Sequence, residues 1–271
     1  MNEKNFVYED KESKKAWSDK AQIHLVKINH KNDLENFLDS NLKIAQAKKN
    51  SSITEKNSTS IVRDLVSSNI PIPLQKNNFS EKELTGLIGE IISEKFLVDT
   101  DVGNEFYIKW KEKGTSNSQG IDIILRKNLT LPINESKHSH KQIATSGNHE
   151  NLLSGIINDA FKQNSEYHTV LNLARLYLKF YKAIPVLDAS GSDSTDMQDK
   201  ANFVRSIIQS GAFITNMTMV IDDKFKIDSN LLSQLIDFNS FPAFRNTITS
   251  FILNIDSLQT ITKKIIEKYT K

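Results

Sequence analysis

The chain has 271 residues, 38% of them hydrophobic, enough to bury a core in one large domain or two modest ones. Its 35 basic and 33 acidic residues leave a formal charge of +2, so any nucleic-acid groove must be local. The absence of cysteine excludes disulfides, thiolate zinc sites and cysteine nucleophiles. Neither a signal peptide nor a membrane span is indicated, and we expect a cytoplasmic protein.

The N-terminal segment, residues 1–20, is charged and non-periodic, and we expect a loose arm there. Ile23 and Leu25 then indicate a first strand, and apolar spacing predicts a helix that starts near Asp33. Residues 47–60 are mostly Lys, Asn, Ser and Thr, which favours a polar surface loop or a helix end.

The strongest helix signal covers residues 81–98. Ser80 and Glu83 have the spacing of a capping box, and apolar residues recur at three- and four-residue steps. This buried stripe comprises Leu84, Leu87, Ile88, Ile91, Ile92 and Phe96. Three short β-like stretches follow, at about 105–110, 120–127 and 130–137, so the order predicts an α/β fold with a meander.

From residue 151 onward the pattern turns mainly helical. The expected helices include 170–181, 203–208, 231–238 and 258–269, and residues 217–221 suit one more strand. We therefore divide the chain into the arm (1–20), an N-terminal region (21–150) and a mainly helical C-terminal part (151–271) that packs on the core.

Three charged residues are predicted to meet on the last two strands of the meander. If a tight turn around Asn128-Leu129 joins them, antiparallel pairing sets Asp122 opposite Glu135, with Cα atoms about 4.5 to 5.5 Å apart. Period-2 alternation puts Lys137 on the same sheet face as Glu135. Two carboxylates can hold Mg²⁺, or alternatively Mn²⁺, and a neighbouring ammonium stabilises phosphate charge, as phosphodiester hydrolysis requires.

The Glu-x-Lys spacing alone is not specific. Glu12-Ser13-Lys14 is the same tripeptide, and Asp222-Asp223-Lys224 also fits the pattern. The first lies in the charged arm, and the second has no upstream aspartate near enough to form a hairpin partner. Context therefore favours Glu135 and Lys137, and the alternative for them is the solvated, charged end of a hairpin.

Glu90 is the candidate fourth member of the site. It lies on the strong helix, off the apolar stripe and beside Gly86 and Gly89, whose missing side chains allow a close approach. The alternative is an ordinary solvated carboxylate on the helix surface.

These motifs occur in the order Gly86-Leu87-Ile88-Gly89-Glu90, Gly120-Ile121-Asp122 and Asn134-Glu135-Ser136-Lys137-His138. Over about residues 80–140 the chain resembles the PD-(D/E)xK restriction-endonuclease-like superfamily, and more narrowly the HamA family of nuclease subunits from Hachiman antiphage defence. In that superfamily a proline often precedes the motif aspartate, whereas in this chain Ile121 precedes Asp122.

The resemblance implies a restriction-endonuclease-like core, with a mixed central sheet flanked by helices. It implies catalytic roles for Glu90, Asp122, Glu135 and Lys137, with Asp122 and Glu135 as ligands of Mg²⁺. It also implies a DNA substrate and a partner, a HamB-like superfamily 2 helicase that controls the nuclease. Because the chain has no Gly-x-x-x-x-Gly-Lys-Ser/Thr loop, ATP use would belong to that partner.

Two alternatives stay open. In the first, the nuclease-like fold belongs to a non-catalytic, nucleic-acid-binding or scaffolding subunit whose charges are structural. Separately, one helical segment alternates basic and aromatic residues, which suits either a nucleic-acid groove or a core with a solvated flank. That segment contains Arg175, Tyr177, Lys179, Phe180, Tyr181 and Lys182.

Overall fold

The computed structural model describes residues 6–16, 21–30, 33–65, 79–113, 122–126, 131–138, 166–189, 194–223 and 248–270. Its strands are β1 (Val7–Ala16), β2 (Ala21–Asn29), β3 (Asn104–Ile108), β4 (Ile123–Arg126), β5 (Leu131–His138), β6 (Phe213–Asp222) and β7 (Ile248–Ile255). Its helices are α1 (Leu34–Leu65), α2 (Glu81–Asp99), α3 (Lys109–Lys113), α6 (Glu166–Ala189), α7 (Thr195–Ser210) and α9 (Leu258–Tyr269).

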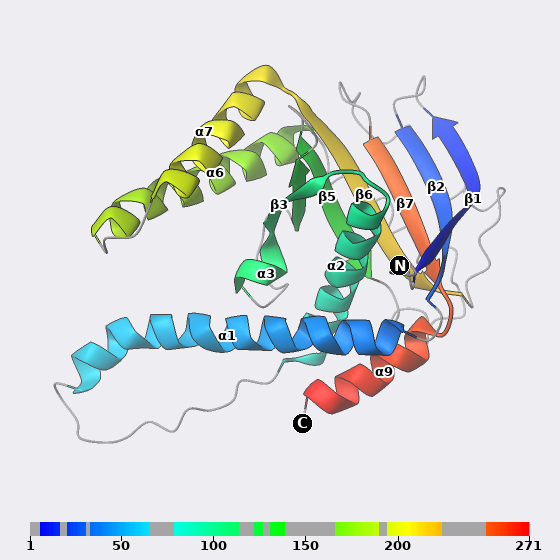
Figure 1. The fold of residues 1–271 in the computed structure, drawn as a ribbon, viewed down its shortest axis with the longest axis horizontal. Coiled ribbons are helices and arrows are strands. Elements are labelled where there is room, and N and C mark those ends of the chain that lie inside the picture. Colours follow the sequence, from blue (N-terminus) through cyan, green and yellow to red (C-terminus); the bar gives the residue numbers. More distant parts are fainter. Residues whose placement is uncertain are drawn as a thin grey trace, which may run out of the picture.

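The described strands form one seven-stranded mixed sheet in the order β1-β2-β7-β6-β5-β4-β3 (Figure 1). The four central strands β2, β7, β6 and β5 are parallel to their neighbours in that group. At one end of the sheet β1 pairs antiparallel with β2, and at the other end β4 pairs antiparallel with both β3 and β5. The fold is therefore mixed α/β, and the strands on either side of residue 150 belong to the same sheet.

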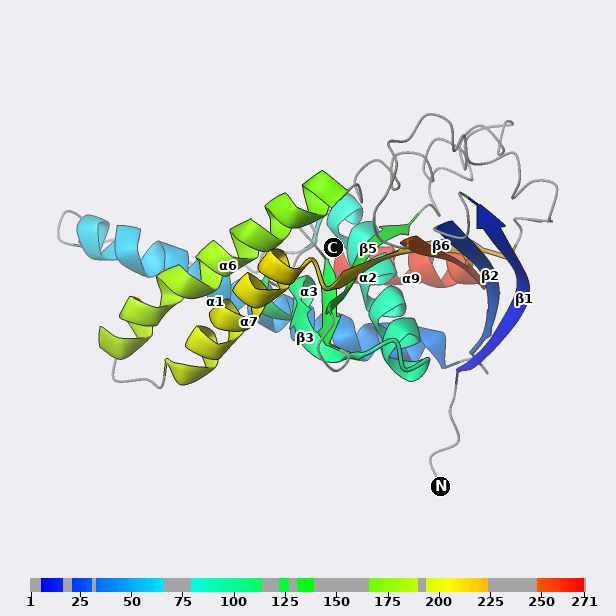
Figure 2. The same ribbon diagram turned by 90° about the horizontal axis from the view of Figure 1, so that it is seen from above.

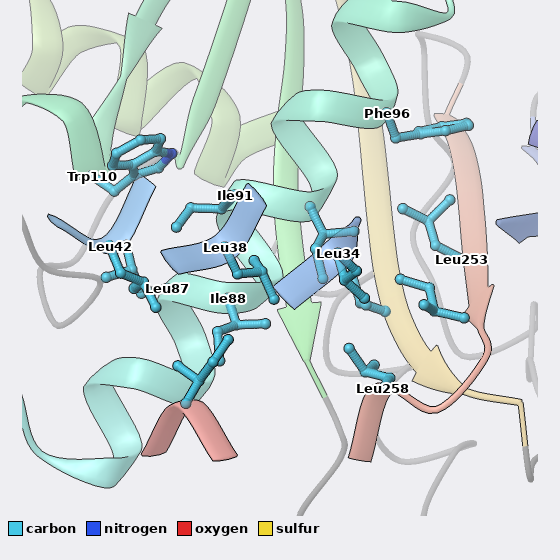
Figure 3. Close-up of a cluster of buried hydrophobic side chains, with 14 of the residues drawn as sticks. Leu34, Leu38, Leu42, Leu87, Ile88, Ile91, Phe96, Trp110, Leu253 and Leu258 are labelled. Atoms are coloured by element: carbon cyan, nitrogen blue, oxygen red, sulfur yellow. The ribbon is translucent and has the colours of Figure 1, made fainter. Parts of the chain in front are cut away.

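Helices pack on both faces of this sheet (Figures 1 and 2). One face packs against α1, α2 and α9 in a large apolar core, part of which is drawn in Figure 3. Leu38 of α1, Ile88 of α2 and Trp110 of α3 are fully buried in that core. On the other face, α6 and α7 pack against β3 and β4 in a second cluster that includes Tyr107, Ile124 and Phe180.

The strongest helix has the N-terminus that its sequence predicts. The Glu83 backbone N–H donates to Ser80 Oγ at 3.2 Å, and the Ser80 backbone N–H donates to Glu83 Oε2 at 2.7 Å. This reciprocal pair is the expected capping box, and it satisfies donors that a helix start otherwise leaves unpaired. All six residues of the predicted apolar stripe are buried.

Several expectations about local structure are wrong. Residues 7–16 are not a loose arm but the edge strand β1, which forms an antiparallel hairpin with β2. Residues 47–60 are neither a loop nor a helix end but lie within the long helix α1. The strand expected at 105–110 ends at Ile108, where α3 begins. The expected helix at 231–238 lies outside the described residues.

The C-terminal part, expected to be mainly helical, also contributes two central strands. The expected strand at 217–221 is confirmed as part of β6, whereas β7 was not expected. The expected helices at 170–181, 203–208 and 258–269 are confirmed within α6, α7 and α9. None of the helices that the structure describes is both long and apolar enough to cross a membrane.

Candidate active site at the start of β4

Asp122 lies immediately before β4 and is 4% exposed. The following strand fixes its position, because Ile123 packs in the core against α1, α2 and α9 while Ile124 packs in the cluster against α6 and α7. The backbone carbonyl of Asp122 also accepts a hydrogen bond from the Lys109 backbone N–H at 2.9 Å. Apolar packing on both faces of the sheet therefore holds this carboxylate in place.

The register between β4 and β5 is the one that the sequence predicts. Ile123 pairs with Asn134 and Ile124 with Ile133, antiparallel. Continued by one residue, the same register would bring Asp122 opposite Glu135. Glu135 and Lys137 occupy alternate positions of β5, so both belong to one face of the sheet. Their side chains lie outside the described part of the structure, so the meeting of all three charges remains a prediction.

Asp122 has a buried cationic neighbour that the sequence analysis missed. Lys109 Nζ lies 2.5 Å from Asp122 Oδ1, and both side chains are 5% exposed. Lys109 is the first residue of α3, directly after β3. The position of Lys109 between the apolar run Phe106-Tyr107-Ile108 and Trp110 indicated burial. Nothing in the sequence indicated that Lys109 pairs with Asp122.

Glu90 is also buried, at 4% exposed, so it is not a solvated helix carboxylate. It lies on α2, which packs against β5 and β6. Burial raises the pKa of Tyr107, and the negative charges of Glu112, Asp122 and Glu90 raise it further. Glu90 and Asp122 therefore both act on the same phenol, which indicates that the two carboxylates belong to one region of the molecule.

A second buried carboxylate on α2, Glu94, was not predicted. Its Oε2 accepts from Trp110 Nε1 at 2.8 Å, and its Oε1 lies 2.6 Å from Lys111 Nζ. Burial raises the pKa of Glu94 to about 7, although the Lys111 ammonium acts in the opposite direction. A carboxyl group with a pKa near neutrality can exchange a proton at physiological pH, which is typical of functional sites.

The two rival tripeptides have different surroundings. Glu12-Ser13-Lys14 lies in β1, which pairs only with β2 among the strands that the structure describes, at the far edge of the sheet from β3 and β4. The second tripeptide is Asp222-Asp223-Lys224, which begins at the end of β6. Asp222 is fully buried, and its Oδ2 accepts a hydrogen bond from the Gln259 backbone N–H at 2.6 Å, at the start of α9. A helix-capping role accounts for Asp222.

Asp122 supplies carboxylate oxygens, the type of ligand that hard cations such as Mg²⁺ prefer. In the structure its Oδ1 binds the Lys109 ammonium, and the chain has no thiolate to favour a softer metal. Among the side chains that the structure describes, no group of three or more His, Asp or Glu residues forms a metal site. The side chain of Glu135, the predicted second ligand, is not among those described.

No protein-family model matches the chain, and no curated protein sequence matches it.

Proposed function

We propose that this protein is a Mg²⁺-dependent DNA nuclease that hydrolyses phosphodiester bonds. One observation supports the proposal: β4 and β5 pair with Ile123 opposite Asn134, a register that, continued by one residue, would bring the buried Asp122 opposite Glu135, with Lys137 two positions further along β5. Two acids and an amine on neighbouring strands suit the hydrolysis of a charged phosphodiester. The mixed sheet with helices on both faces agrees with the architecture that the PD-(D/E)xK resemblance implies.

Each residue has a distinct role in this proposal. Asp122 and Glu135 would hold Mg²⁺, or Mn²⁺ in its place, and Lys137 would stabilise charge on the phosphate or orient the attacking water. The bound ion would supply a Lewis acid and lower the pKa of a bound water. Glu90, buried on the neighbouring helix α2, would act as a further acid at the same site. The burial of Asp122 and Glu90 strengthens the electrostatic interactions that these two carboxylates make.

The biological setting follows from the resemblance alone. HamA-like nuclease subunits imply an effector of bacterial antiphage defence, held in check by a superfamily 2 helicase similar to HamB. The helicase would detect damaged or foreign DNA and release the nuclease. Such control predicts low activity for the isolated chain and higher activity for the complex with ATP and DNA.

The test is degradation of plasmid and linear DNA, with and without the helicase and ATP, in Mg²⁺, Mn²⁺ or EDTA. Glu135→Ala and Lys137→Ala should abolish cleavage and protection while the protein stays folded. The chain contains its own matched controls, because Glu12→Ala and Lys14→Ala change the same tripeptide at the opposite edge of the sheet. Wild-type cleavage by the Glu135→Ala variant would refute the proposal.

A second candidate function is a non-catalytic subunit that binds nucleic acid or acts as a scaffold. The buried ion pair between Lys109 and Asp122 favours it, because that pair gives the proposed metal ligand a structural partner. This function predicts DNA binding without cleavage in both Mg²⁺ and Mn²⁺, whether or not the helicase is present. Cleavage that depends on Glu135 would exclude it.

A further inference from the structure

The outer face of α6 exposes large apolar side chains. Leu178 is 48% exposed and Tyr181 is 54% exposed, whereas Phe180, between them in sequence, is buried against Tyr107 and Phe106. Figures 1 and 2 show α6 and α7 side by side, extending away from the sheet. The helix therefore buries one side in the fold and presents a partly apolar side to its surroundings.

The same exposed face is basic. Arg175, Lys179 and Lys182 are all exposed, and their spacing of three, four and seven residues places them along one side of the helix together with Leu178. Between Glu166 and Asp188 the helix contains no acidic residue. In a chain whose net charge is only +2, this is a local concentration of positive charge.

Two tyrosine rings are already arranged side by side on this helix. The rings of Tyr177 and Tyr181 stack with centroids 5.8 Å apart and an interplanar angle of 27°. Tyr177 is half-buried and Tyr181 is exposed, so the pair is anchored at one end and open at the other. An anchored, exposed ring loses little conformational entropy when a planar ligand stacks on it.

Lys179 ties α6 to the short helix α3. It forms an ion pair with Glu112 of α3, and its Nζ lies 4.7 Å from the centre of the Tyr107 ring. The charge of Lys179 is therefore already paired within the fold, and Arg175 and Lys182 are the cations of this face that remain for a ligand.

We propose that the outer face of α6, formed by Arg175, Leu178, Tyr181 and Lys182, binds single-stranded nucleic acid. The inference rests on the proposed nuclease function, which it extends with a substrate-binding surface. The cations contact phosphates and the exposed ring stacks on an unpaired base, a combination that does not depend on sequence. A single strand fits better than a duplex, because bases inside a duplex do not offer their faces to Tyr181.

Binding is measured by fluorescence anisotropy of a labelled oligothymidine with the full-length protein in EDTA, so that cleavage does not interfere. Tyr181→Ala should weaken binding by about tenfold, whereas Tyr181→Phe, which keeps the ring, should bind as the wild type does. The double variant Arg175→Ala/Lys182→Ala should reduce the slope of log K against log salt by about 1.4, or about 0.7 for each phosphate contact. The control is Lys263→Ala, which removes an exposed cation from α9.

The outcomes separate this surface from the active site. Binding of oligothymidine in EDTA is measured without cleavage, so failure of the nuclease proposal leaves this measurement intact. Unchanged affinity and salt slope in both Tyr181→Ala and the double variant would overturn the proposal. So would variants that keep oligothymidine binding but lose capture of the helicase, because the face would then bind a protein partner.

Discussion

Replacing Lys109 by methionine keeps most of the shape of the side chain and removes its charge. In the wild type, Nζ of Lys109 and Oδ1 of Asp122 are 2.5 Å apart, and both side chains are 5% exposed. In the variant, the Asp122 carboxylate remains buried without this ammonium. Removing one partner of a buried ion pair destabilises a protein by about 3 to 5 kcal/mol, because the remaining charge is uncompensated. We expect Lys109→Met to lower the free energy of unfolding by an amount in this range.

Urea unfolding of four proteins measures the effect: the wild type, Lys109→Met, Asp122→Asn and the double variant. The double variant removes both charges, so it should recover much of the stability that Lys109→Met loses. The expected coupling energy between the two sites is about 1 to 3 kcal/mol. A loss of less than about 1 kcal/mol in Lys109→Met would refute our reasoning, because Asp122 would then not depend on this ammonium.

Adding Mg²⁺ or Mn²⁺ to the same unfolding experiment tests the metal proposal without reference to cleavage. An ion that binds only the folded state stabilises it by about 2.7 kcal/mol at a concentration of 100 times its Kd. Because Lys109 occupies one oxygen of Asp122, Lys109→Met should gain more stability from the ion than the wild type does. If neither protein responds to either ion, Asp122 is not a metal ligand.

Two further predictions concern helix α2. Burial raises the pKa of Glu94 from its usual 4.5 to about 7. Between pH 4.5 and pH 7 the folded state therefore binds more protons at Glu94 than the unfolded state does, and the wild type loses stability as the pH rises through this range. Glu94→Gln should therefore gain thermal stability relative to the wild type between about pH 4.5 and pH 7; a pH-independent difference would contradict this. Ser80→Ala removes the acceptor of the capping box with Glu83 and should cost about 1 kcal/mol in urea unfolding, whereas an unchanged midpoint would show that the cap contributes nothing.

The sequence allowed prediction wherever the determining interaction was local. The capping box joins Ser80 and Glu83, which are three positions apart, and the pairing of β4 with β5 depends on a short hairpin connection. Such features follow from spacing alone. The register in which Ile123 pairs with Asn134 could therefore be predicted from the sequence.

The missed strands lack the local patterns on which prediction relies. β1 is an edge strand rich in charged residues. Charge on an edge strand protects it from pairing with other chains, and it also removes the alternation of apolar and polar residues by which a strand is predicted. β7 lies between two parallel neighbours and contains the continuous apolar run Phe251-Ile252-Leu253, which has no period of two. Both were recognisable only from their partners in the sheet.

The contact between Lys109 and Asp122 was out of reach for a related reason. The two residues are joined through the meander of β3 and β4, and the pair exists because α3 begins where β3 ends. The sequence instead predicted a strand that continued to Trp110. In a continued strand, neighbouring residues 109 and 110 would lie on opposite faces of the sheet. In α3, Trp110 reaches Glu94 while Lys109 reaches Asp122.

The burial of charge at this edge of the sheet is itself an argument for function. A buried ion pair stabilises a fold little compared with apolar residues of similar volume, because desolvation offsets most of the attraction. Ile123 and Ile124, fully buried on opposite faces of the sheet, already hold the start of β4 in place without the charges. Stability therefore does not explain why Lys109 and Asp122 are buried beside β3 and β4, or why Glu90 is buried on α2. Binding and hydrolysis of a charged substrate would explain it, since preorganised charges in a site of low dielectric stabilise a transition state most strongly.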